Sequence, residues 1–215
     1  MSGYTGPPMW TDTETTWGRV SRWLHWGTAA LVVGAVMLGL WLADRSPTYG
    51  ATGEAAWEWM GAAAHHTAGL LVLLLTLFRA NWRLNVARPA YPAGLDPWRR
   101  RLAKGVQVLL YLLLLALPIS GWAALTTGAA DLPIYFFGFE IPRMYEEPPA
   151  TSFAHDLFAW LHWALWVAGG GVLALHLVGA GLSQLRDGDG TIVRMWRGTA
   201  GQSDRSGEAE PPSST

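Results

Sequence analysis

Four long apolar runs constrain the fold of this chain more than any other feature of its sequence. They cover roughly residues 24–43, 61–78, 105–126 and 153–185. A helix crosses the ~30 Å hydrocarbon core of a bilayer in roughly 20 residues, because each residue adds ~1.5 Å. Only 14% of the 215 residues are charged and 51% are hydrophobic, which is unlike a water-soluble domain of this size. With short links between the runs, the sequence predicts an all-α protein, an up-and-down bundle of four transmembrane helices.

The ends of the chain differ in composition from these runs. Residues 1–15 and 198–215 are rich in Gly, Ser, Pro and charge, so we expect both segments to be disordered. The first apolar run is not typical of a cleaved signal peptide, because it begins late and three further runs follow it. We therefore expect one membrane domain at 16–197. The segment 127–152 contains proline, aromatic residues and glutamate, and is expected to form a partly ordered cap on the outer surface.

Basic residues lie almost entirely on one side of the predicted membrane. All 15 Lys and Arg residues except Arg45 and Arg143 fall in the N-terminal segment, the link between the second and third runs, or the C-terminal tail. Cytoplasmic segments of membrane proteins carry such an excess, so we expect both termini to be cytoplasmic. The chain has no cysteine, which excludes disulfides, iron–sulfur clusters and thiolate zinc sites. Nothing in the sequence indicates a nucleic-acid partner.

Histidines inside the apolar runs are candidates for function, because an ionisable side chain is costly to place in a membrane. The predicted topology puts one histidine near the inner end of the first helix, two near the outer end of the second and two on the fourth: His25, His65, His66, His162 and His176. His162 and His176 are fourteen residues apart, which is ~21 Å along a helix and about 40° short of four full turns. Both imidazoles are therefore expected on one face of the fourth helix at two depths.

At each depth another helix offers a partner histidine. His176 can pair with His25 on the inner side, and His162 can pair with His65 or His66 on the outer side. Two imidazoles that face each other across a bundle core are typical bis-histidine ligands of a haem iron. The alternative is a set of structural histidines that hydrogen-bond to neighbouring helices, but these would rarely sort into two matched levels. The pattern therefore favours two haem groups.

Two glycines are expected to lie beside these groups. Gly169 is seven residues from each histidine of the fourth helix, and Gly69 is four residues after His65, so each shares its histidine's face. Small residues there would admit a flat porphyrin, although close packing of two helices is the alternative reading. Gly69 favours His65 over His66, which points about 100° away. His155 has no partner on another helix and is expected to hydrogen-bond at the interface.

Three arginines, Arg22, Arg79 and Arg83, lie near the cytoplasmic ends of the predicted helices. Their main expected role is to set the topology and to extend their charged ends to the membrane interface. A second role is to pair with the propionate carboxylates of the inner haem, because the guanidinium fork matches a carboxylate.

Several segments together resemble the bacterial cytochrome b561 family. They are SRWLHW in the first run, HHTAGLLVLLLTLFRANWR in the second, LLYLLLLALPISGW in the third, the histidine pair of the fourth, and RDGDGTIVRMWRG after it. The resemblance extends over about residues 16–198. It implies a four-helix, multi-pass protein of the bacterial inner membrane that contains two b haems.

The resemblance also implies which residues would hold each haem. The axial ligands would be His25 and His176 on the cytoplasmic side, and His65 and His162 on the outer side. In the family pattern the ligand of the second helix is followed by Gly four residues later and Arg fourteen residues later. Gly69 and Arg79 occupy these positions only if that ligand is His65, and both are then expected to contact a haem.

Two positions depart from the pattern of many members. Gln107 stands where they carry a histidine four residues before the tyrosine of the third helix, and Ser183 and Gln184 stand where some carry a histidine pair. The resemblance implies that these positions lie near the inner haem, where some members act on quinone. The details of a quinone site are therefore not expected to match those members.

The resemblance implies single-electron transfer across the membrane, and some members oxidise superoxide and reduce ubiquinone. The predicted outer segments carry eight acidic residues against two arginines: Asp44, Glu54, Glu58, Asp131, Glu140, Glu146, Glu147 and Asp156 against Arg45 and Arg143. Such a face would repel a small anion, so quinone and a basic periplasmic redox protein are the expected partners. One alternative is a cytochrome b anchor subunit of a larger hydrogenase or dehydrogenase. The other is a haem-free membrane protein whose histidines bind a metal or a proton.

Overall fold

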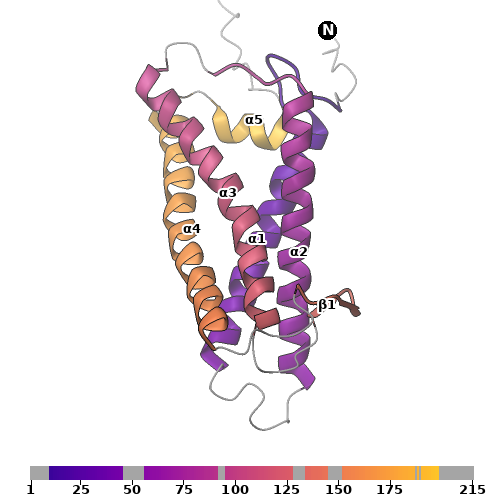
Figure 1. Cartoon of the computed structure of the whole chain (residues 1–215). Helices are drawn as coiled ribbons and strands as arrows, with labels where there is room; N and C mark the ends of the chain where they lie inside the picture. The colour runs from indigo at the N-terminus through magenta and orange to yellow at the C-terminus, as the bar shows by residue number, and fades with distance from the viewer. Residues whose placement is uncertain are drawn as a thin grey trace, which may run out of the picture.

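The computed structural model describes residues 10–45, 56–91, 95–127, 134–144, 152–186, 188 and 190–198. Within these ranges the chain forms five helices and one pair of short strands (Figure 1). In chain order they are α1 (Arg19–Arg45), α2 (Ala56–Asn85), α3 (Pro97–Thr127), β1 (Ile134–Phe136), β2 (Phe139–Ile141), α4 (Ser152–Arg186) and α5 (Thr191–Arg197). Four helices, α1 to α4, are long and apolar enough to cross a membrane. The predicted four-helix transmembrane bundle is confirmed.

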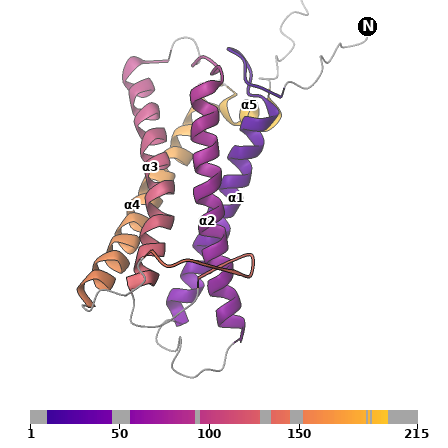
Figure 2. The ribbon, with the colours of Figure 1, turned by 45° about the vertical axis from the view of Figure 1, so that its right-hand side comes forward.

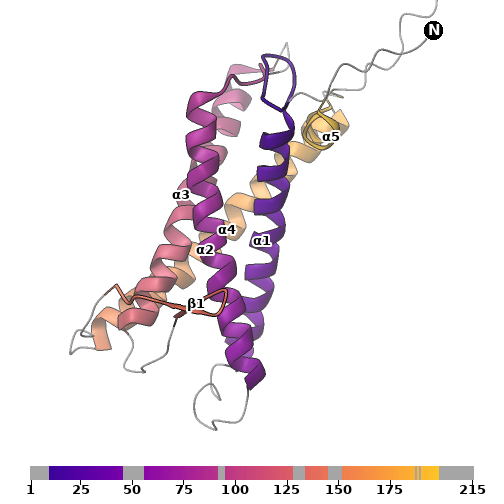
Figure 3. The ribbon, with the colours of Figure 1, turned by 90° about the vertical axis from the view of Figure 1, so that its right-hand side faces the viewer.

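The long helices pack in chain order. α1 lies along α2, α2 along α3, and α3 along α4, as Figures 1 and 2 show. α4 runs obliquely to the other helices, which is clearest in Figure 3. Within the described residues, α1 and α4 pack against each other far less extensively than these neighbouring pairs do. The bundle is therefore most open between its first and last long helices.

The bundle has small polar side chains inside and large apolar side chains outside. Thr28 and Ser120 are buried, and their hydroxyls donate to carbonyl oxygens of their own helices. By contrast, Val33, Leu112 and Leu177 are 61%, 56% and 62% exposed. Membrane helices associate through small residues, because lipid solvates large apolar side chains as well as a protein core does. The outward surface is therefore suited to contact with lipid.

The N-terminal segment folds onto one end of the bundle. The Asp12 carboxylate is buried and accepts hydrogen bonds from Gly18 N at 2.7 Å and from Ser21 Oγ at 2.6 Å. The backbone N–H of Ala90 donates to the carbonyl of Glu14 at 2.8 Å. These bonds hold residues 10–15, the last part of the segment expected to be disordered, against the start of α1. Residues 1–9 and 199–215 lie outside the described residues.

A short hairpin lies at the opposite end of the bundle, beside α2 (Figures 1 and 2). β1 and β2 pair antiparallel, and the chain turns through Phe137 and Gly138, both with positive φ. The Thr67 hydroxyl donates to the Tyr135 carbonyl at 3.4 Å and accepts from Phe137 N at 3.3 Å. Trp122 Nε1 donates to the Pro142 carbonyl. The structure thus describes residues 134–144 of the expected cap. Residues 128–133 and 145–151 lie outside the described residues.

Candidate functional site

The structure brings the rings of His65 on α2 and His162 on α4 close together near the hairpin end of the bundle, in an edge-on arrangement. Their ring centroids are 6.4 Å apart and the ring planes are inclined at 85°. His65 Nδ1 lies 2.9 Å from the Ala35 carbonyl oxygen, and His162 Nδ1 lies 3.0 Å from the Leu117 carbonyl oxygen. A carbonyl oxygen only accepts, so Nδ1 carries the proton in both rings and Nε2 keeps its lone pair. Metal-binding histidines are commonly oriented by this kind of second hydrogen bond.

The second pair is formed by His25 of α1 and His176 of α4. Their ring centroids are 6.2 Å apart and the planes are inclined at 58°. Two imidazoles that share one metal ion at a bond length of ~2.1 Å have centroids about 6.4 Å apart. Both pairs therefore have the spacing of bis-histidine ligation, and the two levels predicted from the sequence are present.

The inner pair differs from the outer pair in its second hydrogen bond. Arg79 Nη2 lies 2.9 Å from His25 Nδ1. A guanidinium only donates, so Nδ1 of His25 accepts, and a neutral ring then carries its proton on Nε2. For His25 to bind iron through Nε2, Arg79 has to release Nδ1. The distance between the His25 and His176 rings already suits a haem iron. The proton on His25 suits it only after Arg79 has released Nδ1.

The arginines near the inner pair have neutral partners. The Arg79 guanidinium lies over the Tyr111 ring at 5.6 Å. Arg83 donates to Gln107 Oε1 at 3.3 Å and lies over the Trp17 ring at 5.1 Å. None of these partners in the described part of the chain is a carboxylate, and a partly buried charge without a counter-ion is costly. The cluster is therefore suited to a group that brings its own carboxylates, as a haem does.

A cavity of about 620 Å³ adjoins the outer pair. All four long helices line it, together with Ile134 of the hairpin, which is only 3% exposed. The volume lies within the range of ligand and cofactor pockets. The lining is mainly apolar, and it includes His65, His162 and Gly69. A flat apolar cofactor that needs two imidazoles fits this cavity.

The donor set also favours a macrocycle over a bare ion. Among the described residues, no three His, Asp or Glu side chains gather at one point. A bare zinc or iron ion usually takes three or four protein ligands. A haem iron has four nitrogens from its porphyrin and needs only two axial ligands from the protein.

Glycines bring the outer histidines close to backbone, and two of them were not predicted. A methyl group on Gly39 would lie 3.1 Å from His65 Cε1, and one on Gly121 would lie 3.0 Å from His162 Cε1. Gly39 could have been found from the sequence, because it is fourteen residues after His25 and so shares its face at the outer level. Gly121 follows no histidine on its own helix and gives no such signal. Gly69 opens onto the cavity.

The other predicted positions have different surroundings. A methyl group on Gly169 would make an ordinary contact with Leu117 of α3 at 3.7 Å, which is typical of helix packing. His66 lines the cavity with its ring centroid 6.3 Å from that of His65, and its Nδ1 has no hydrogen-bond partner in the described part of the chain. His155 Nδ1 lies 2.9 Å from the Ala124 carbonyl oxygen of α3. His155 was expected to hydrogen-bond at the membrane interface, and here its partner is a backbone carbonyl of α3.

Comparisons with known proteins agree with the resemblance drawn from the motifs. The family model for prokaryotic cytochrome b561 matches residues 16–198. The chain is also 31% identical over 187 residues to cytochrome b561 homolog 2 of Escherichia coli (strain K12), across 86% of this chain and 93% of that protein. The chain therefore belongs to the prokaryotic cytochrome b561 family, membrane proteins that transfer electrons through b-type haem.

Proposed function

We propose that this protein binds two b haems and carries single electrons through the membrane between a redox partner on the outer face and the quinone pool. His65 and His162 ligate the outer haem, and His25 and His176 ligate the inner haem. The observation that carries the proposal is the pairing of imidazoles at two levels, with ring centroids 6.4 Å and 6.2 Å apart. The fourteen residues between His162 and His176 separate the levels by ~21 Å along α4.

The haem iron supplies the one-electron chemistry, and the chain supplies ligation, orientation and charge. At the outer site the carbonyl oxygens of Ala35 and Leu117 hold the rings with Nε2 directed away from the backbone contact. At the inner site Arg79 would pair with a haem propionate, which would free His25 Nδ1 to carry the ring proton. Gly69 gives the outer porphyrin edge room, and Gly169 keeps α4 close to α3 between the two levels.

The α5 end of the bundle is cytoplasmic in this proposal. Basic residues are concentrated after α2, before α3 and after α4, which is the end of the bundle where α5 lies. An excess of basic residues marks the cytoplasmic side of a membrane protein. In this proposal the membrane domain spans residues 16–197. The protein lies in the bacterial inner membrane with both termini inside.

The acidic outer segments favour a basic partner over the superoxide anion. If a basic redox protein is the partner, its rate of electron exchange falls as ionic strength rises, because salt screens the attraction. Reduction of the purified protein by superoxide near the diffusion limit, with little dependence on ionic strength, would contradict this assignment. Co-purification of a second oxidoreductase subunit would instead favour the role of a membrane anchor in a larger enzyme.

Haem counting tests the ligand assignment. Reduced-minus-oxidised spectra and haem quantitation should give two b haems per chain in the wild type. His65→Ala and His25→Ala should each lose one haem, because each removes one axial ligand. His66→Ala is the matched control and should retain both. A His66→Ala variant that loses a haem, with His65→Ala retaining two, would show that the ligand of α2 is misassigned.

A further inference from the structure

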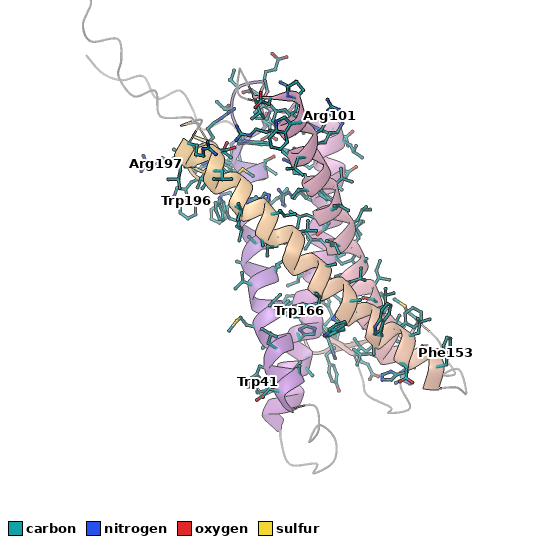
Figure 4. The ribbon with its side chains drawn as sticks, turned by 90° about the vertical axis from the view of Figure 1, so that its left-hand side faces the viewer. Trp41, Arg101, Phe153, Trp166, Trp196 and Arg197 are labelled. Atoms are coloured by element: carbon teal, nitrogen blue, oxygen red, sulfur yellow. The ribbon has the colours of Figure 1, made fainter. Side chains whose placement is uncertain are left out.

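The short helix α5 joins the two helices that carry the inner histidine pair. His25 lies on α1 and His176 on α4, yet these two helices pack only sparsely against each other within the described residues. α5 follows α4 and crosses to the start of α1, as Figures 1 and 3 show. In Figure 4, Trp196 and Arg197 of α5 lie at the end of the bundle opposite to Phe153 and Trp41. α5 is thus placed to control the separation of α1 and α4.

Side chains of α1 bind the C-terminal end of α5. Trp26 Nε1 donates to the Met195 carbonyl at 3.0 Å, and Arg22 Nη1 donates to the Trp196 carbonyl at 2.8 Å. The last carbonyls of a helix have no partner within it, so α1 supplies the missing donors. The rings of Trp26 and Trp196 also meet edge to face, with centroids 5.0 Å apart.

The C-terminal end of α5 packs tightly against the start of α1. Gly198 ends α5 with a φ of 93°, a conformation that favours glycine. A methyl group there would lie 3.2 Å from Arg22 Cζ and 3.2 Å from the Trp17 carbonyl oxygen. Arg194 Nη2 donates to the Thr15 carbonyl at 3.0 Å, which fastens α5 to the N-terminal segment as well.

The other end of α5 is fastened to α4. The backbone N–H of Ile192, in the first turn of α5, donates to Gln184 Oε1 of α4 at 3.1 Å. Gly188 and Gly190, both with positive φ, let the chain reverse in the few residues between the helices. Gln184 is eight residues after His176, or ~12 Å along α4. α5 therefore contacts α4 about two turns beyond His176.

Trp26 links this connection to the ligand itself. It follows His25 directly in the chain, and the two rings meet edge to face with centroids 5.1 Å apart. A shift of α5 would move the indole that is bonded to it, and the His25 ring packs against that indole.

We propose that α5 is a clasp that sets the distance and the relative orientation of the His25 and His176 rings, and that Trp26 is a positioning residue for the inner haem. The inference rests on the proposed function, because it takes these two histidines as the inner axial ligands. Trp26 acts through His25 and touches neither iron nor substrate in this scheme.

The test replaces single groups of the clasp in the full-length, haem-loaded protein. Trp26→Phe removes the indole donor and keeps an aromatic ring, and Gln184→Leu removes the acceptor at the other end. Trp23→Phe is the matched control, because Trp23 is on the same helix but 75% exposed. The readouts are haem content, the redox titration of each haem, and the electron paramagnetic resonance spectrum of the ferric protein. The largest g-value of a bis-histidine haem depends on the angle between its two imidazole planes.

Both clasp variants should shift the g-value and the midpoint potential of the inner haem and leave those of the outer haem unchanged. Trp23→Phe should match the wild type. If Trp26→Phe loses the inner haem altogether, the g-value and midpoint potential of the inner haem can still be measured in Gln184→Leu. Unchanged inner-haem signals in both clasp variants, with two haems bound, would overturn the clasp and leave the proposed function standing. A wild-type protein without a haem at His25 and His176 would overturn both.

Discussion

The close approach of Gly121 to His162 makes the outer site sensitive to a single methyl group. In Gly121→Ala the new carbon would lie 3.0 Å from His162 Cε1. Carbon atoms in contact prefer ~3.5–4.0 Å, so the ring has to move by roughly 0.5–1 Å. The bond from His162 Nδ1 to the Leu117 carbonyl is 3.0 Å long, and this shift would stretch it beyond hydrogen-bond range.

Loss of that bond weakens the outer site without removing its ligand. Groups that orient a metal-binding histidine typically contribute ~10–100-fold to metal affinity. We therefore expect Gly121→Ala to raise the rate of haem loss from the outer site by about this factor, with the inner haem unaffected. The rate is measured by transfer of haem from purified protein to an excess of a haem-scavenging apoprotein.

A matched control is available on the same helix. A methyl group on Gly105 of α3 meets no atom within 4 Å, so Gly105→Ala should keep the wild-type rate. Equal rates for Gly121→Ala and the wild type, with both haems retained, would refute the reasoning. Such a result would mean that the His162 ring does not depend on the backbone of α3 for its position.

Two further predictions concern the ends of the bundle. Asp12→Ala removes the acceptor for Gly18 N and Ser21 Oγ, and should lower the free energy of unfolding by about 2 kcal/mol in thermal denaturation; Glu14→Ala is the control, since its side chain is exposed. Thr67→Val removes a hydroxyl that holds the hairpin, a loss of ~1 kcal/mol, and should speed amide exchange in residues 134–141 roughly fivefold. An unfolding free energy of Asp12→Ala equal to that of the wild type would contradict the role of the Asp12 carboxylate. A wild-type rate of amide exchange in Thr67→Val would contradict the role of the Thr67 hydroxyl.

The helices and the two histidine levels could be predicted from the sequence because they depend on simple periodicities. Apolar length gives the spans, and helical rise and rotation give the depth and face of each histidine. These quantities follow from one helix at a time. The pairing of His162 with the histidines of the second helix needs only the further assumption that neighbouring helices run antiparallel, and the choice of His65 over His66 depends on Gly69 as well.

Features that depend on contacts between distant segments could not be predicted. The hydrogen bond from Arg79 to His25, which sets the proton position of that ring, joins two helices whose rotation the sequence does not give. The close approach of Gly121 on α3 to His162 on α4 also depends on the rotation of two helices, so it could not be predicted either. The buried contacts of the Asp12 carboxylate, which hold residues 10–15 to α1, could not be read from composition either.

The contrast between the two sites also bears on the direction of electron flow. Each outer histidine donates Nδ1–H to a carbonyl oxygen, which makes the imidazole a stronger donor and favours ferric iron. At the inner site Arg79, which in the proposal exchanges His25 Nδ1 for a haem propionate, would still place a positive charge near the iron and favour its reduced form, which has one positive charge less. A unit charge ~10 Å from the iron, at an effective dielectric constant of ~20, contributes ~1.7 kcal/mol, or about 70 mV for one electron.

We therefore expect the inner haem to have the higher midpoint potential, so that electrons pass downhill from the outer face toward the quinone side. Redox titration of the single-haem variants His65→Ala and His25→Ala assigns each potential to its site. Arg79→Gln should lower the inner potential by about 70 mV and leave the outer one in place. An outer haem with the higher potential, or an inner potential that rises in Arg79→Gln, would show that axial hydrogen bonding and the arginine charge do not set the direction of transfer.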